Sequence, residues 1–265
     1  MVIKTIIVGL TNDRALNSVY VALDVAKLFD AHIVGFVGRY IPPILAPDPT
    51  GALAQAIQDA DAQVLEAAEK AFVATVPAER RAGWRAVVNL PDRGLAIEGR
   101  AADLIVVGGS DETRAYYDLG SLIVNAGRPV LVTADHLPTI AAKRIVVGWK
   151  DTREARRAVA DSLAFLTQAS EVVLALIDEG DGVDRHGGAE VQRYLARHGI
   201  SSRIEAASAF GDKNAAGKLR DIARHIGADM IVAGAYGHSR FREMIFGGVT
   251  KSLLQDRTMH HLMSS

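Results

Sequence analysis

The sequence predicts a tandem α/β protein, in which two doubly wound, Rossmann-like domains with parallel sheets follow one another along 265 residues. An internal repeat is the first reason, because KTIIVGLTND from Lys4 returns as KRIVVGWKDT from Lys143. AADLIVVGGS and GADMIVAGAY then match in the same order, and they align Asp103 with Asp229. Short β-branched runs also alternate with amphipathic stretches, which is typical of βαβ crossovers.

The second half has the clearer pattern of apolar runs and three- and four-residue spacings. Its strands are expected at residues 144–147, 171–177, 203–206 and 229–233. Its helices are expected at residues 153–167, 188–198 and 217–226. Apolar runs this continuous indicate strands that are buried on both faces of a parallel sheet.

The first half follows the same order, with helices expected at residues 16–29, 53–75 and 96–100. Its closing strand is RPVLVTA, in which Pro129 can begin a strand but not lie in the middle of a sheet. The following ADHLPTIAA contains Pro138 and lacks periodicity, which indicates a linker. We therefore expect domains at residues 1–136 and 143–265.

Composition and charge narrow the class of protein. Thirty basic and thirty-one acidic residues leave a formal net charge of -1, which gives no overall attraction to nucleic acid or to an anionic membrane. The absence of cysteine excludes a disulfide scaffold, a thiol nucleophile and a cysteine zinc site. The apolar run in MVIKTIIVGLTNDR is too short for a signal peptide or a membrane span. We expect a cytoplasmic protein with neither nucleic acid nor membrane as partner.

The segment GAYGHSRFREMIFGGVTKSLL follows the last of these strands directly and is the main candidate for a binding site. Glycine lets the backbone approach an anion, and amides at the start of the following helix favour phosphate. Ligands of such sheets bind outside the carboxyl ends of the strands. The expected phosphate-binding residues are Gly234, Gly237, Gly247, Gly248 and Thr250, the last through its hydroxyl group.

Two interpretations of this segment stay open. The glycines either form an anion site or serve only turns and close helix–strand packing. His238, Arg240 and Arg242 lie between the two glycine pairs and either meet outer phosphate oxygens or are solvated.

With this wording, GAYGHSR followed by GGVT, the chain resembles the universal stress protein family over essentially its whole length, as two tandem domains. The family motif is G-x-x-G, nine residues, then G followed by Ser or Thr. The resemblance implies an adenine nucleotide, ATP or AMP, with or without Mg²⁺, across the strand ends. It also implies that the two domains form an intramolecular pseudo-dimer through edge strands, and a further homodimer stays open.

The resemblance assigns roles to individual residues. Ribose and phosphates would lie against Ala233, Gly234, Gly237, Gly247, Gly248, Val249 and Thr250. His238 lies within the same loop, and Leu176 would offer its backbone to adenine. The loop after the first strand of the second half contributes Gly148, Lys150 and Asp151.

Two positions depart from the family pattern. Lys150 stands where the family has Asp, and it pairs with a phosphate, pairs with Asp151 or is solvated. Gly248 replaces Ser or Thr, which removes a hydroxyl contact and keeps the amide.

The first half departs further, because Asp111 replaces the second glycine of the motif. A carboxylate about 4 Å from a phosphate charge costs roughly 4 kcal/mol at an effective dielectric constant near 20. We therefore expect the first half to bind no ordinary nucleotide and to have a structural role.

Three functions compete: a nucleotide-binding stress or signalling protein, a slow ATP hydrolase, and an interaction module with an empty site. Against catalysis, the sequence has no G-x-x-x-x-G-K-[ST] loop, and only Asp151 and His238 are candidate acid–base groups. We therefore assign no catalytic residue. His260 and His261 are adjacent, lie in a strand or tail, and make a poor metal site.

Overall fold

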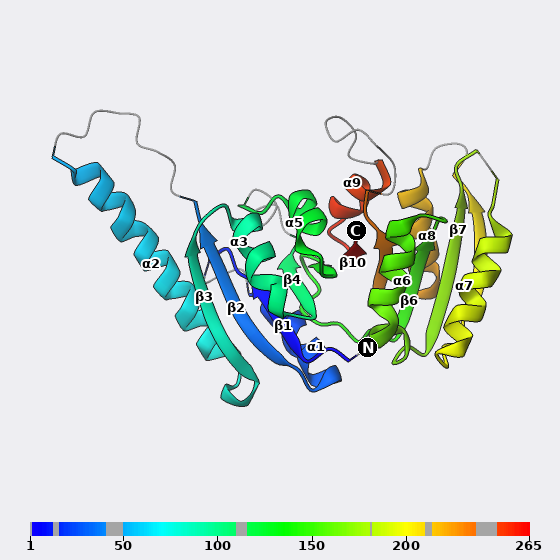
Figure 1. Cartoon of the computed structure of the whole chain (residues 1–265), viewed down its shortest axis with the longest axis horizontal. Coiled ribbons are helices and arrows are strands. Elements are labelled where there is room, and N and C mark those ends of the chain that lie inside the picture. Colours follow the sequence, from blue (N-terminus) through cyan, green and yellow to red (C-terminus); the bar gives the residue numbers. More distant parts are fainter. Residues whose placement is uncertain are drawn as a thin grey trace.

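The computed structural model shows two α/β halves with helices on both faces of a sheet (Figure 1). It describes residues 2–12, 16–40, 50–109, 116–180, 182–209, 214–236 and 248–265. The predicted doubly wound fold class is confirmed, although the two sheets are joined into one.

The first half contains strands β1 to β5 and the helices between them. The strands are β1 (Thr5–Gly9), β2 (His32–Arg39), β3 (Arg81–Val88), β4 (Leu104–Gly108) and β5 (Val130–Thr133). The α-helices are α1 (Asn17–Phe29), α2 (Ala52–Thr75), α3 (Pro91–Glu98) and α5 (Leu119–Ala126). Short 3₁₀ turns cover Ala78–Arg80 and Gly99–Ala101. The helix expected at 96–100 therefore begins earlier, because Pro91 is a favourable first helical residue.

The second half repeats this order with strands β6 to β10. The strands are β6 (Arg144–Trp149), β7 (Glu171–Asp178), β8 (Arg203–Ser208), β9 (Met230–Gly234) and β10 (His260–Ser264). The helices are α6 (Arg153–Leu166), α7 (Arg185–Arg197), α8 (Ala215–Ile226) and α9 (Gly248–Leu254). The C-terminal segment, which the sequence left as a strand or a tail, is a fully buried strand.

One ten-stranded sheet runs through both halves in the order β3-β2-β1-β4-β5-β10-β9-β6-β7-β8. Neighbouring strands are parallel within each half, and β5 pairs with β10 in antiparallel orientation. The strand order reverses between β1 and β4 and again between β6 and β9. Each reversal is a topological switch point, where sheets of this kind bind ligands.

The internal repeat extends to a matching pair of hydrogen-bond sites. The Asp103 carboxylate accepts from the backbone N–H groups of Lys4 (2.8 Å) and Thr5 (2.9 Å). Asp229 accepts from the N–H groups of Lys143 (2.7 Å) and Arg144 (2.8 Å) in the same way. Each carboxylate satisfies the backbone at the start of the first strand of its half, which explains why the repeat retains Asp at both positions.

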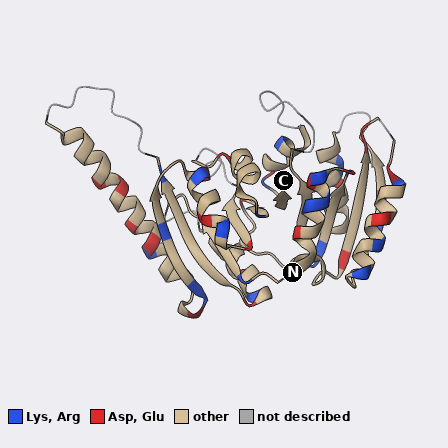
Figure 2. Cartoon of the chain, viewed as in Figure 1, with Lys and Arg blue, Asp and Glu red and all other residues tan. Residues whose placement is uncertain are grey.

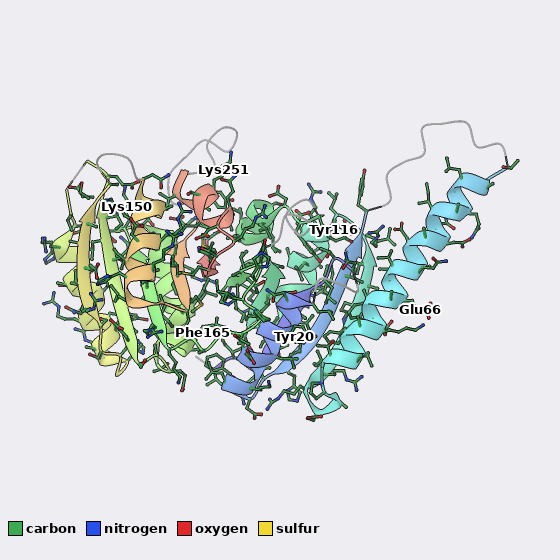
Figure 3. The ribbon with its side chains drawn as sticks, turned by 180° about the vertical axis from the view of Figure 1, so that it is seen from behind. Tyr20, Glu66, Tyr116, Lys150, Phe165 and Lys251 are labelled. Atoms are coloured by element: carbon green, nitrogen blue, oxygen red, sulfur yellow. The ribbon has the colours of Figure 1, made fainter. Side chains whose placement is uncertain are left out.

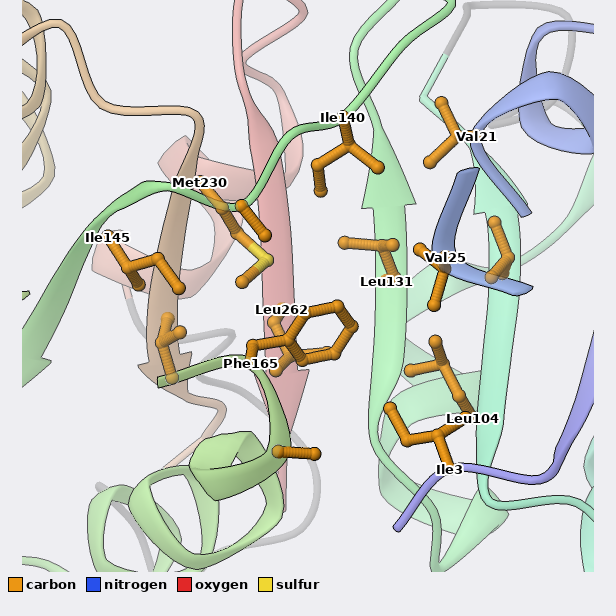
Figure 4. Packing of buried hydrophobic residues seen from close by; sticks show 14 of the residues in the cluster. Ile3, Val21, Val25, Leu104, Leu131, Ile140, Ile145, Phe165, Met230 and Leu262 are labelled. Atoms are coloured by element: carbon orange, nitrogen blue, oxygen red, sulfur yellow. The ribbon is translucent and has the colours of Figure 1, made fainter. Parts of the chain in front are cut away.

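The core has one layer on each face of the sheet. Helices α1, α2, α6 and α7 cover one face, and α3, α5, α8 and α9 cover the other. At the junction of the halves Leu131 of β5 is the register partner of Leu262 of β10, with Ile140 and Phe165 beside them (Figure 4). Phe165 also meets Phe29 of α1 edge to face, with ring centroids 5.1 Å apart.

The surface carries charges of both signs, interspersed on α2 and α7 among other elements (Figure 2). No helix in the described part of the chain is long and apolar enough to cross a membrane.

Candidate functional site

A cavity of about 370 Å³ lies at the carboxyl ends of β6, β7 and β9 in the second half. It therefore lies at the switch point between β6 and β9. In sheets of this kind, ligands bind outside the carboxyl ends of the strands at this point. Seven residues predicted for the site line it: Gly148, Lys150, Ala233, Gly234, Gly248, Val249 and Thr250. Lys150 and Lys251 lie at the same end of this half, whereas Phe165 lies toward the other end (Figure 3).

Two well-capped helices begin at this cavity. Thr152 caps α6 by accepting from the Ala155 N–H at 3.2 Å, and it lines the cavity. Asn214 caps α8 by accepting from the Gly217 N–H at 3.0 Å, and it lines the cavity as well. Positive helix ends from both sides therefore favour an anionic ligand.

The two described glycines of the loop have different environments. A Cβ built on Gly234 would lie 2.5 Å from the Ala155 nitrogen and 2.5 Å from the Glu154 carbonyl carbon. Gly234 is therefore required for close packing of β9 against α6. A Cβ built on Gly248 meets no described atom within 4 Å, so Gly248 leaves open space beside the cavity.

Tyr236 and Thr250 join the two described ends of the loop. The Tyr236 N–H donates to the Thr250 hydroxyl oxygen at 3.2 Å. Tyr236 has a φ of 65°, which is uncommon for a residue with a side chain and is often found at functional sites. Burial and the nearby Asp118 carboxylate of the first half raise the pKa of Tyr236 to about 12. The ring is therefore neutral at physiological pH and lies close to the junction of the halves.

Lys150 forms an ion pair across the mouth of the cavity, with its Nζ atom 3.0 Å from Oε2 of Glu179. Glu179 is a partner that the sequence did not suggest. Asp151 is in turn bonded to Arg156, whose Nε and Nη2 atoms lie 2.9 and 2.7 Å from its Oδ1 atom. Asp151 and Leu176 line a neighbouring cavity of about 340 Å³ and not the first one.

Leu176 is 2% exposed, and the role expected for its backbone stays a prediction. Three predicted residues, Gly237, His238 and Gly247, lie outside the described residues, as do Arg240 and Arg242. Their roles stay predictions as well.

At the matching position of the first half lies a buried tyrosine side chain. Tyr117 is 1% exposed, and its hydroxyl group donates to the Leu10 carbonyl oxygen at 2.9 Å. A Cβ built on Gly9 would lie 3.0 Å from that hydroxyl oxygen and 2.9 Å from Leu95. At the matching Gly148, the nearest described atoms belong to Leu219 and Val232. The Tyr117 ring thus occupies space at the switch point of the first half.

Tyr116, the residue before Tyr117, makes contacts with β2. Its hydroxyl group donates to the Gly38 carbonyl oxygen, and the Arg39 guanidinium lies 5.9 Å from its ring centroid. Arg39 is itself paired with Asp61 of α2, which is 8% exposed.

Sequence reasoning missed several residues that line the cavity, among them Trp149, Ile177, Glu179, Asn214, Leu219 and Tyr236. Asn214 had a usable signal, since it precedes a helical pattern and is a preferred N-cap residue. The others depend on contacts between strands and helices that are distant in sequence. Within the described ranges, no group of three or more His, Cys, Asp or Glu side chains is arranged to hold a metal ion.

Comparison with solved structures identifies the fold. A universal stress protein from Archaeoglobus fulgidus DSM 4304 matches with a TM-score of 0.69 and 14% identity, over 98% of this chain and 96% of that one. A candidate universal stress protein from Pseudomonas aeruginosa UCBPP-PA14 matches with a TM-score of 0.61 and 16% identity, over 99% of this chain and 93% of that one. No protein-family model and no curated protein matches the sequence. The chain therefore has the fold of these universal stress proteins over its whole length.

Proposed function

We propose that the second half binds an adenine nucleotide, ATP or AMP, in the 370 Å³ cavity, and that the protein acts in stress response or signalling. One observation carries the proposal: the described glycine-loop residues, Gly234, Gly248, Val249 and Thr250, line the same cavity as the starts of α6 and α8. Such a volume falls within the range of small-molecule sites, roughly 300 to 1,000 Å³.

The described residues fit such a ligand. Gly248 has no side chain to obstruct a phosphate, and the Thr250 hydroxyl can donate while its oxygen accepts from Tyr236. Ala175 and Ile177 of β7 and Leu219 of α8 provide an apolar wall suited to a base. The charges of Lys150 and Glu179, which form an ion pair beside the cavity, cancel each other. Mg²⁺, where it accompanies the nucleotide, would then be held mainly by the phosphates and water.

The first half has a structural role in this proposal. Tyr117 fills its switch point, so we assign one nucleotide to each chain. The antiparallel pairing of β5 with β10 supports a pseudo-dimer of domains at 1–136 and 143–265. A homodimer of chains and a cytoplasmic location remain predictions.

Titration of fluorescent ATP and AMP against the wild type and Gly248→Asp tests nucleotide binding. The new carboxylate enters open space beside the cavity, where repulsion of a phosphate about 4 Å away costs roughly 4 kcal/mol. We expect affinity to fall roughly a thousandfold. Gly248→Ser is the matched control, since it adds a side chain and a hydroxyl group without charge.

Two outcomes would contradict the proposal: no binding by the wild type, or equal binding by the wild type and Gly248→Asp. Mass spectrometry of gently purified protein provides an independent check, because a retained adenine nucleotide excludes a permanently empty site.

A further inference from the structure

Helix α9 forms one wall of the cavity through its first three residues, Gly248, Val249 and Thr250. It is only seven residues long and lies near the middle of the molecule, where the two halves meet (Figure 1). Helices shorter than about 12 residues are barely stable on their own in water, so contacts with the rest of the protein must hold α9 in place. The position of this wall therefore depends on the contacts that α9 makes along its length and in the turn that follows it.

A buried carboxylate fixes the turn that follows α9. Oδ1 of Asp256 accepts from the Thr258 N–H at 2.9 Å and from the Thr258 hydroxyl group at 2.7 Å. Its Oδ2 atom lies 3.7 Å from Nε2 of His261 in β10. Asp256 is 8% exposed and His261 is fully buried, so water and salt screen neither group strongly. Asp256 thus joins the turn to a central strand of the sheet.

The first half holds the same turn. The Asp135 N–H donates to the Arg257 carbonyl oxygen at 3.0 Å, which extends the antiparallel pairing of β5 with β10 beyond the two strands. Oδ2 of Asp135 also lies 3.6 Å from Nη1 of Arg257. The Asp135 side chain is 9% exposed, so this attraction is screened less than that of a fully exposed ion pair. A residue of the first half therefore takes part in holding a helix that lines the cavity of the second.

The other described end of the glycine loop also lies next to the first half. The Tyr236 N–H donates to the Thr250 hydroxyl oxygen at 3.2 Å, and burial and the nearby Asp118 carboxylate raise the pKa of Tyr236 to about 12. Asp118 is itself fixed, because its Oδ1 atom accepts from the Ser121 N–H at the start of α5 at 3.0 Å. Groups of the first half thus lie beside Tyr236 and beside the turn after α9.

We propose that Asp135 and Asp256 are positioning residues of the nucleotide site, so that the first half helps to set the affinity of the cavity in the second. The two carboxylates hold the turn after α9, and α9 in turn holds Gly248 and Thr250 against the end of β9. This inference rests on the proposed function, because it concerns the same cavity. It gives the first half a role in binding, although its own switch point holds the Tyr117 ring.

Calorimetric titration of ATP and AMP against carboxylate variants tests the inference. Asp135→Ala removes the pairing with the Arg257 side chain and leaves the backbone bond in place, so affinity for both nucleotides should fall about fivefold or more. Asp256→Ala loosens the turn itself, and the loss should reach about tenfold or more. Asp256→Asn should keep most of the wild-type affinity, because the Asn carbonyl oxygen can accept both bonds from Thr258.

Two controls separate positioning from a general loss of stability. Asp59→Ala makes the same substitution in the first half, at an exposed carboxylate of α2 that bonds to Gln55, and it should keep the wild-type Kd. Urea unfolding identifies the variants that are fully folded under the titration conditions. In a fully folded variant, lower stability alone leaves the Kd unchanged, whereas a displaced α9 raises it.

The outcomes separate the two proposals. Equal affinities of Asp135→Ala and Asp59→Ala would overturn the role of the first half while the nucleotide site stands. An equal loss in Asp256→Ala and Asp256→Asn would show that the bonds to Thr258 do not position α9. Absence of binding by the wild type would refute the nucleotide site and this inference with it. Should Asp256→Ala fail to fold, Asp135→Ala decides the question, because it changes only one ion pair at the edge of the turn.

Discussion

The Tyr117 hydroxyl group donates to the Leu10 carbonyl oxygen at 2.9 Å, across 107 positions of sequence. This bond places a buried ring at the switch point of the first half. The equivalent position of the second half is a cavity. Among the described residues, one switch point of the duplicated fold thus holds a buried tyrosine ring and the other holds a cavity.

The filled switch point predicts a binding stoichiometry of one nucleotide per chain. Tyr117→Phe should keep this value and lower the free energy of unfolding by about 1–3 kcal/mol, because the buried Leu10 carbonyl loses its donor. Tyr117→Ala should lower it by about 3–5 kcal/mol through loss of the ring. Calorimetric titration gives the stoichiometry and urea unfolding gives the stability. A wild-type stoichiometry of two would show that Tyr117 does not close the first half.

Replacing each of the two described loop glycines, Gly234 and Gly248, by alanine should have different effects on stability. Gly234→Ala places a Cβ 2.5 Å from backbone atoms of α6, and we expect at least about 1–3 kcal/mol of destabilisation from overpacking. Gly248→Ala enters open space at the start of α9, where Ala has the better helix propensity, so stability should hold or rise slightly. Thermal melts of the two variants, prepared together, compare them directly. Equal destabilisation would contradict the difference in packing.

His260 predicts that stability falls in mild acid. Its Nδ1 atom accepts from the Ala134 N–H at 3.1 Å, so Nε2 carries the proton that bonds to the Thr139 carbonyl oxygen at 3.1 Å. Burial lowers the pKa of His260, against smaller opposing effects of the Thr139 carbonyl and the Asp229 carboxylate. The unfolded chain therefore takes up this proton first as pH falls. Stability from this group is complete above about pH 7.5 and decreases below about pH 6.5 until the folded pKa is reached.

Urea unfolding at pH 7.5, 6.5 and 5.5 measures this contribution, which is at most about 1.4 kcal/mol per pH unit for one proton. His260→Gln provides an uncharged acceptor and donor, and it should flatten the pH dependence relative to the wild type. His32→Gln, at an exposed position on β2, is the matched control and should not. An unchanged slope in His260→Gln would contradict the role of His260.

The junction of the halves predicts a shared unfolding transition. Phe165 of α6 is fully buried and packs against Phe29 of α1, beside the β5–β10 pair. Phe165→Ala should lower the free energy of unfolding by about 3–5 kcal/mol. Because the core is continuous across the junction, both halves should unfold together in the wild type. Tryptophan fluorescence follows both, since Trp84 lies in the first half and Trp149 in the second, and two separate wild-type transitions would refute a common core.

Most of the architecture follows from the sequence alone. Apolar periodicity and the two pairs of repeated blocks determined the order of strands and helices and the tandem arrangement. The position of Gly234 after a buried strand determined which end of the second half holds the cavity. These properties are local, because hydrophobic spacing and turn chemistry act over a few residues.

The tertiary structure alone decided the remaining features. It showed that β10 joins β5, that Lys150 pairs with Glu179, and that Tyr117 fills the first switch point. It also showed that Gly234 is required for packing against α6. Each of these contacts joins residues that are far apart in the chain, so their distance and burial depend on how strands and helices pack and not on the local pattern around either residue.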